Sequence, residues 1–239
     1  MTGRPYTLLS CAVSVDGCLD DASAERLVLS GPEDLDEVDK LRAAADAILV
    51  GAGTIRADDP RLLVRDPDRV VGRVAAGRPP HPLRVTVTAT GDLDPAARFF
   101  AVRGGGAALV YCATPALAAA QARLGQIAEV IDAGDPPSLV RVFEDLHSAR
   151  KVATLLVEGG ARILRDVLAD DLADELRLAV APFFVGDPAA PRFGLPAAYP
   201  HSPADPMALA DVRHLGDVAV LHYWLNGRAR PSGLPPFVP

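Results

Sequence analysis

Residues 47–65 read Ala-Ile-Leu-Val-Gly-Ala-Gly-Thr-Ile-Arg-Ala-Asp-Asp-Pro-Arg-Leu-Leu-Val-Arg, and the rest of the chain is organised around this stretch. An apolar run of strand length comes first, and a glycine-rich turn and a short charged segment follow it. Such a turn presents backbone N–H groups to an anion, and arginine side chains bind phosphate through two parallel hydrogen bonds. The stretch therefore predicts one half of a site for a phosphorylated ligand.

The composition is typical of a globular protein that works in water. The 239 residues are 49% hydrophobic and 23% charged, with a net charge of −7. This charge argues against nucleic-acid and membrane-surface partners, and no apolar run approaches the roughly 20 residues that span a bilayer. The first residues do not form a signal peptide. Three scattered cysteines indicate neither a disulfide framework nor a metal site, so we expect reduced thiols in a cytoplasmic protein.

Strands alternate with helices to about residue 170, and strands alone follow. This order predicts one α/β domain, residues 1–228, in which helices flank a mixed, mostly parallel sheet with an antiparallel C-terminal hairpin. The predicted strands are residues 6–13, 47–50, 83–88, 107–112, 127–131, 152–157, 175–185, 211–215 and 218–225. The predicted helices are residues 30–45, 114–124, 138–149 and 161–169. Residues 72–82 and 187–206 are predicted loops, and residues 229–239 a Pro-rich tail.

The first predicted helix has a recognisable start. Ser30 is the expected N-cap, and Pro32 suits the first turn because its missing N–H would be unpaired there anyway. Leu35, Val38 and Leu41 recur at helical spacing and supply the expected apolar face.

A second glycine turn, Glu158-Gly159-Gly160, follows another apolar strand and leads directly into a helix. Ligands bind beyond the carboxyl ends of strands in open α/β sheets, so this turn is the expected complement of residues 51–54. Neither turn is a Rossmann or Walker A motif. Because a buried carboxylate is costly without a partner, Glu158 either contacts a ligand or pairs with a structural arginine.

Other polar residues allow two interpretations each. Asp16 precedes Gly17 and is either a turn residue or a polar group at the ligand mouth. Arg42 and Arg65 are either phosphate ligands or solvated charges. The histidines show no metal-ligand spacing, and no nucleophile motif is present. The pattern therefore favours a nucleotide-binding site in which a bound cofactor carries out the chemistry.

Taken together, these motifs resemble the reductase domain of bacterial riboflavin-biosynthesis deaminase-reductases, which has a dihydrofolate-reductase-like fold. The resemblance covers roughly residues 5–223 and rests on motifs that occur in order. They are Ser14-Val15-Asp16-Gly17, Ser30-Gly31-Pro32, Leu41-Arg42-Ala43, Ala47-Ile48-Leu49-Val50-Gly51-Ala52-Gly53-Thr54, Ala57-Asp58-Asp59-Pro60-Arg61-Leu62, Leu156-Val157-Glu158-Gly159-Gly160, Asp174-Glu175-Leu176 and Ala181-Pro182. It implies an NADPH-dependent oxidoreductase, a homodimer, that reduces the ribose of a ribosylaminopyrimidine 5′-phosphate to ribitol.

The resemblance implies a role for each site residue, beside the two glycine turns and the carboxylates that the sequence pattern indicates, and no metal ligand is among them. Glu158 and Asp16 are assigned to catalysis. The residues assigned to the cofactor are Ala12, Gly51, Gly53, Thr54, Asp58, Gly159, Gly160, Ala161, Arg162, Ile163 and Leu164. The residues assigned to the substrate are Arg42, Leu62, Arg65 and, again, Glu158.

One position departs from the family pattern. The family often has Ser-x-Trp just before the first helix, whereas this chain reads Arg26-Leu27-Val28. The change removes an aromatic platform and a hydroxyl from the expected ligand wall. Two alternatives therefore stay open: a reductase of the same fold for another heterocycle such as a dihydropterin, and a non-catalytic protein that binds NADPH or another nucleotide.

Overall fold

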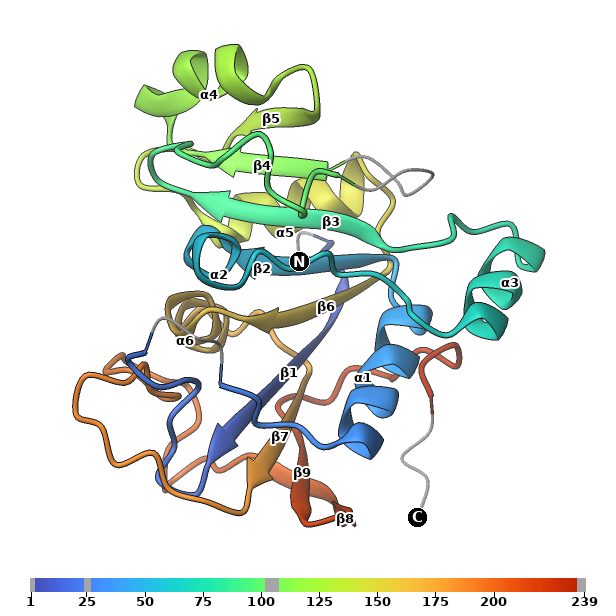
Figure 1. The fold of residues 1–239 in the computed structure, drawn as a ribbon, viewed down its shortest axis with the longest axis vertical. Coiled ribbons are helices and arrows are strands. Elements are labelled where there is room, and N and C mark those ends of the chain that lie inside the picture. The colour runs from blue at the N-terminus through green and yellow to red at the C-terminus, as the bar shows by residue number, and fades with distance from the viewer. Residues whose placement is uncertain (1–2, 24–26, 102–107, 236–239) are drawn as a thin grey trace.

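The computed structural model describes residues 3–23, 27–101 and 108–235. In these residues one nine-stranded sheet has the order β5-β4-β3-β2-β6-β1-β7-β9-β8 (Figure 1). The strands are β1 Tyr6–Ser14, β2 Ala47–Gly51, β3 Leu83–Thr88, β4 Ala108–Cys112, β5 Ala128–Asp132, β6 Thr154–Gly159, β7 Glu175–Ala181, β8 Ala208–Leu215 and β9 Val218–Trp224. The pairs from β5 to β7 are parallel, and β9 is antiparallel to both β7 and β8. The predicted mixed sheet with a C-terminal hairpin is confirmed.

Helices cover both faces of the sheet (Figure 1). They are α1 Pro32–Ala44, α2 Ala52–Asp58, α3 Pro67–Ala75, α4 Leu117–Leu124, α5 Leu139–Ser148 and α6 Ala161–Ala169, and a 3₁₀ turn, Thr114–Ala116, precedes α4. Leu41 of α1 and Ile55 of α2 pack in one core cluster with Ile48. Phe143 of α5 and Leu164 of α6 pack in the other with Leu49. Successive side chains of β2 thus pack into the core clusters on opposite faces of the sheet, because side chains alternate along a strand.

Two helices were missed by the sequence analysis. The segment after the first glycine turn is not irregular, because α2 begins at Ala52, directly after β2. The predicted loop at residues 72–82 overlaps α3, whose Asp66 cap accepts hydrogen bonds from the amides of Asp68 and Arg69. Gly72 lies inside α3, and the helix tolerates it despite the cost of glycine in a helix.

The start and the inner face of α1 also differ from expectation. The cap position is Gly31 without a side-chain cap, so the assignment of Ser30 as cap is wrong. Leu41 is buried as expected, but the other buried residues of α1 are Asp34 and Asp39. Both carboxylates have partners from distant parts of the chain, and therefore no apolar period could reveal this face.

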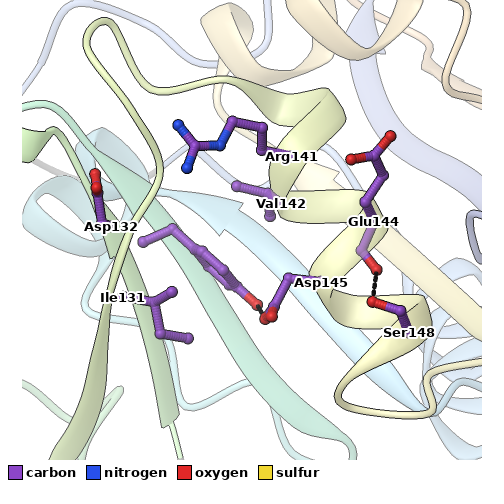
Figure 2. A pocket seen from close by; sticks show the side chains of 8 residues that line it. Ile131, Asp132, Arg141, Val142, Glu144, Asp145 and Ser148 are labelled. Atoms are coloured by element: carbon purple, nitrogen blue, oxygen red, sulfur yellow. Dashed lines mark hydrogen bonds between the residues drawn. The ribbon is translucent and has the colours of Figure 1, made fainter. Parts of the chain in front are cut away.

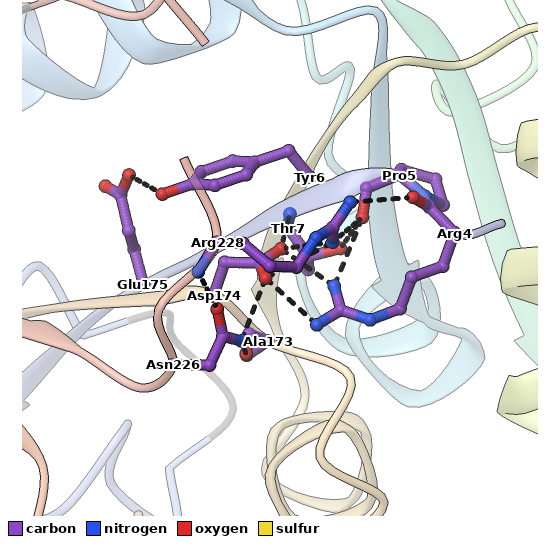
Figure 3. Close-up of polar contacts among 9 residues, drawn as sticks. All are labelled: Arg4, Pro5, Tyr6, Thr7, Ala173, Asp174, Glu175, Asn226 and Arg228. Atoms are coloured by element: carbon purple, nitrogen blue, oxygen red, sulfur yellow. Dashed lines mark hydrogen bonds and ion pairs between the residues drawn. The ribbon is translucent and has the colours of Figure 1, made fainter. Parts of the chain in front are cut away.

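The segment before β1 and the segment after β9 meet at the amino ends of β1 and β7 (Figure 3). Asp174 is 1% exposed and accepts hydrogen bonds from Arg4 at 2.7 Å and from the amide of Thr7 at 2.7 Å. Asn226 and Arg228, which follow β9, donate to the same carboxylate at 2.9 and 3.0 Å. A buried carboxylate with this many donors is well compensated and anchors the C-terminal segment.

A second buried carboxylate extends this anchor into the predicted tail. Glu175 is fully buried and accepts hydrogen bonds from Tyr6 at 2.5 Å and from Arg230 at 2.8 Å. His222 lies 2.9 Å away through its Nε2 atom. Leu234 is 5% exposed, so the described part of residues 229–239 packs against the domain.

Candidate functional site

The two glycine turns meet at the carboxyl ends of the neighbouring strands β2 and β6. A Cβ atom placed on Gly160 would lie 3.0 Å from Thr54 Oγ1 and 3.6 Å from Gly51 Cα. A Cβ atom on Gly51 would lie 2.9 Å from the side chain of Ile163 in α6. The absence of side chains at 51 and 160 thus allows both turns and the start of α6 to approach closely.

The amino end of α6 points into this junction with unpaired backbone donors. The helix begins at Ala161, and its first backbone hydrogen bond runs from Leu164 N to Gly160 O. The preceding N–H groups, up to Ile163, have no intrahelical acceptor, and the helix dipole adds positive potential there. This geometry suits an anion such as a diphosphate.

Glu158 lies at an irregularity of strand pairing. Leu49 pairs with Val157, but Val50 pairs with Gly159, so the register of β6 against β2 slips by one residue at Glu158. β-Bulges of this kind locally break the ladder and occur frequently beside functional sites. Gly159 and Gly160 follow with φ of 147° and 88°, values that side-chain-bearing residues rarely adopt.

Arg42 in the last turn of α1 binds Glu158 directly. Its Nε atom donates to Oε1 at 2.6 Å and its Nη2 atom donates to Oε2 at 2.5 Å. The third donor, Nη1, reaches the carbonyl oxygen of Leu63 at 3.3 Å. Burial lowers the pKa of Arg42, but Glu158 and then Asp39 outweigh it and the net shift is upward. The structure thus joins two residues that the sequence assigned separately to the substrate.

Residues 61–66, which we call the arm, connect α2 to α3 without regular secondary structure. Leu62 and Val64 are each 3% exposed, whereas Arg61 and Arg65 face outward. Leu62 has a φ of 53° and its side chain lies in the core on the α1 side. Arg65 is therefore exposed at the surface, while the buried side chains of Leu62 and Val64 hold the backbone of the arm against the core.

Asp16 occupies a different position, in the loop after β1. Its carboxylate accepts hydrogen bonds from Ser14 Oγ at 2.6 Å and from the amides of Val185 and Gly186 at 3.1 and 2.8 Å. The Ser14 hydroxyl, followed by these amides, holds the pKa of Asp16 well below its usual range. Asp16 is therefore a poor proton donor at neutral pH and links the loop after β1 to the loop after β7.

The remaining predicted cofactor residues differ in how much of each is accessible. Ala12 is partly exposed and packs against the cluster of Ala179, Val218 and Val220, and Asp58 ends α2. Ile163 and Leu164 point into the core on the α5 side, so their backbone is what the junction exposes. Arg162, Gly53 and part of Thr54 are accessible to solvent.

The wall at residues 26–28 is described only in part. Arg26 lies outside the described residues. The amide of Leu27 donates to Asp20 Oδ1 at 3.0 Å, and Val28 is 66% exposed. An exposed valine thus stands where the family often has tryptophan.

A pocket on the α5 side does not include the predicted residues (Figure 2). It lies between β5 and α5, with Asp132 and Arg141 in its wall, and Tyr111 donates to Asp145 at 2.6 Å beside it. Within the described ranges, no cluster of three His, Cys, Asp or Glu residues could hold a metal ion. The same ranges contain no helix with the length and apolar character needed to cross a membrane.

One polar residue beneath the arm was missed. Asp39 of α1 is 4% exposed, and its carboxylate accepts from the amide of Arg65 at 2.6 Å. The available signal was its spacing, because Asp39 precedes Arg42 by three residues and so lies on the same helical face.

Comparisons with known proteins identify the family of this chain. Residues 5–216 match the family described as the RibD C-terminal domain. The chain is 36% identical to the 2,5-diamino-6-ribosylamino-4(3H)-pyrimidinone 5′-phosphate reductase of Archaeoglobus fulgidus, over 77% of this chain and 83% of that protein. It is 30% identical to the riboflavin biosynthesis protein RibD of Chlamydia pneumoniae, over 89% of this chain and 55% of that protein. A pyrimidine reductase-like protein from Corynebacterium diphtheriae has the same fold, with a TM-score of 0.79 at 21% identity over 94% and 93% of the chains.

The mixed sheet with helices on both faces and a C-terminal antiparallel hairpin is a fold of the dihydrofolate-reductase-like class. Within that class, this chain belongs to the RibD C-terminal domain family, which confirms the resemblance found in its sequence.

Proposed function

We propose that this chain is an NADPH-dependent reductase that converts the ribose of a ribosylaminopyrimidine 5′-phosphate to ribitol, a reaction of riboflavin biosynthesis. The observation that carries the proposal is the contact of the two glycine turns beside the Arg42–Glu158 pair. A cofactor cradle and a polar site are thereby adjacent at the carboxyl ends of β2 and β6. Family membership and the names of the relatives support the reaction type.

The carboxyl ends of β2 and β6 suit NADPH for a steric reason. At residue 160 a Cβ atom would lie only 3.0 Å from Thr54 Oγ1, and the φ of 88° is one that side chains rarely adopt, so the backbone stays bare where a diphosphate must approach. In this proposal, Gly159, Gly160 and the first N–H groups of α6 hold the diphosphate. The side chains of Thr54 and Asp58 contact the rest of the cofactor. When bound, NADPH supplies a hydride.

The chain's own residues bind and orient the sugar. Arg65 binds the 5′-phosphate through its exposed guanidinium. Glu158, held by Arg42, accepts hydrogen bonds from the substrate near C1′. The closed sugar opens to an imine at C1′, which accepts the hydride at carbon and a proton at nitrogen. The site's contribution is to hold donor and acceptor carbons roughly 3–3.5 Å apart and to exclude water.

Asp16 has a supporting part in this proposal. Its carboxylate is occupied by three donors, and it joins the loops after β1 and β7. It therefore shapes the mouth of the site without transferring a proton.

The decisive experiment compares substrates for NADPH oxidation. We expect oxidation with the phosphorylated ribosylaminopyrimidine, mass spectrometry to show a product that has gained two hydrogens, and little oxidation with dihydrofolate. NADH serves as the comparison for cofactor preference. Activity with dihydrofolate alone would contradict the proposed substrate. Tight NADPH binding without oxidation by any ribosylaminopyrimidine phosphate would contradict the proposed reaction.

The protein also forms a homodimer in this proposal, through the edge strand β8. Leu209 and Val212 on this strand are each 56% exposed, a condition that edge strands usually avoid. β7 and β9, by contrast, each have a strand neighbour on both sides within the sheet. Light scattering should give a dimer for the wild type and a monomer for Val212→Lys, and a monomeric wild type would contradict the proposal.

We further assign the protein to the cytoplasm. Its three cysteines are buried as free thiols, which suits a reducing compartment.

A further inference from the structure

Helix α1 touches the arm through two residues that lie one helical turn apart. Arg42 donates to the carbonyl oxygen of Leu63, and Asp39 accepts from the amide of Arg65 at 2.6 Å and from that of Asp66 at 3.2 Å. Helix α1 therefore holds one backbone carbonyl of the arm, that of Leu63, and two backbone amides, those of Arg65 and Asp66. Because Arg42 also binds Glu158, α1 connects both ends of the proposed substrate site.

The environment of Asp39 makes this contact costly to lose. The side chain is 5% exposed, and its charge is balanced by Arg69, whose Nη1 atom donates to Oδ2 at 2.9 Å. Both carboxylate oxygens of Asp39 accept hydrogen bonds. Oδ1 accepts from the amide of Arg65, and Oδ2 accepts from the amide of Asp66 and from the guanidinium of Arg69. An asparagine amide here would turn its own NH₂ group toward donors. Only a carboxylate satisfies all three contacts.

The side chains of the arm show what the contact achieves. Leu62 and Val64 are buried, whereas the side chain of Arg65 is exposed. The backbone amide of Arg65 is the group that Asp39 holds. Within the described part of the chain, the guanidinium of Arg65 makes no hydrogen bond, and only the backbone amide of Arg65 does. The backbone anchor therefore fixes the point from which this side chain extends.

We propose that Asp39 is a positioning residue, which fixes the backbone of Arg65 so that its guanidinium meets the substrate phosphate at a set distance from Glu158. The kinetic part of this inference rests on the proposed function. The sequence analysis assigned no role to Asp39, and its contacts come from residues 26 to 30 positions away.

The test compares two carboxylates that share one arginine. Asp36 also binds Arg69, through Nη2 at 2.5 Å, but it contacts neither the amide of Arg65 nor that of Asp66. We expect Asp39→Asn to raise KM for the phosphorylated substrate about tenfold with little change in kcat, as loss of a charge-assisted hydrogen bond implies. Asp36→Asn should leave KM within about twofold, since surface ion pairs contribute little.

A double-mutant cycle separates positioning from general destabilisation. In an Arg65→Ala background, Asp39→Asn should change KM no further, because the group it positions is already gone. Additive effects on KM would overturn the proposal, and so would an unchanged KM in Asp39→Asn when Arg65→Ala raises it.

Hydrogen exchange tests the contact without relying on catalysis. In the wild type, the amides of Arg65 and Asp66 should exchange slowly although they lie in a surface segment, and Asp39→Asn should accelerate both. Fast exchange in the wild type would overturn the proposal even if the variant failed to fold. If the wild type does not reduce the phosphorylated pyrimidine, the proposed function fails, while exchange still decides whether Asp39 holds the arm.

Discussion

Arg42 and Glu158 form a two-point ion pair between α1 and β6, with distances of 2.6 and 2.5 Å and side chains that are 14% and 10% exposed. Arginine binds carboxylates well in this geometry because its fork matches both oxygens. A ligand that contacts Glu158 therefore meets a carboxylate that is already oriented. Such pre-orientation reduces the ordering cost of binding.

Glu158→Gln should lower kcat/KM about 10- to 150-fold, because hydrogen bonds to charged groups contribute about 1.5–3 kcal/mol. Steady-state kinetics with the phosphorylated pyrimidine measures this. The matched control is Glu129→Gln, which disrupts a similar two-point pair with Arg150, on β5 at the far edge of the sheet. Equal kcat/KM values for the two variants would contradict the role of Glu158.

Gly53→Ala should separate folding from cofactor binding. A Cβ atom there meets nothing within 4 Å, and alanine in a helix is about 0.5–1 kcal/mol more favourable than glycine. The added methyl group would nevertheless lie on the turn proposed to hold NADPH. We expect a higher urea midpoint but a Kd for NADPH raised about 5- to 150-fold, as a steric misfit of about 1–3 kcal/mol implies.

The control for this variant is Gly72→Ala in α3. It also has free space around the new Cβ atom, and it lies outside the glycine turns. We expect it to gain stability without losing NADPH affinity. Identical NADPH titrations for the two variants would argue against a cofactor contact at Gly53.

Arg65→Ala should raise KM for the phosphorylated substrate at least tenfold, because a guanidinium–phosphate contact is charge-assisted. Removing the phosphate from the substrate should abolish most of the difference between variant and wild type. Arg61→Ala, an exposed arginine on the same arm, is the control. An equal loss for phosphorylated and unphosphorylated substrates would show that Arg65 does not read the phosphate.

Stability should fall as the pH drops below about 6.5, and His222 should contribute to this fall. Burial lowers the pKa of His222 below 6.5, and the hydrogen bond to Glu175 offsets this only in part. As the pH falls, His222 is therefore protonated at a higher pH in the unfolded chain than in the folded chain. The stability that neutral His222 contributes is complete above about pH 6.5 and declines below it. Urea midpoints between pH 7.5 and 5 should fall more steeply for the wild type than for His222→Asn.

A variant at an exposed histidine provides the comparison. His214→Asn on β8 should keep the wild-type slope because the side chain is exposed. Parallel pH profiles for wild type and His222→Asn would contradict the assignment.

Local sequence predicted those elements whose signals are local. The bounds of α6 were predicted correctly because apolar residues recur at helical spacing after Gly160. The inner face of α1 was not predicted, because Asp34 is buried against Arg177 of β7, a partner 143 positions away. Helix α3 was missed because Gly72 and the following glycines and prolines resemble a loop.

The sequence by itself determined which strands end in glycine, and so where backbone could meet an anionic ligand. Only the tertiary structure decided what Glu158 contacts. The sequence left a ligand and a structural arginine open, and its partner is Arg42, 116 positions away. The physical reason is that strand order places β6 beside β2, with α1 packed against that face, whereas hydrophobic periodicity records only which face is buried. The same packing brings Asp39 under the arm, where it holds the amide of Arg65.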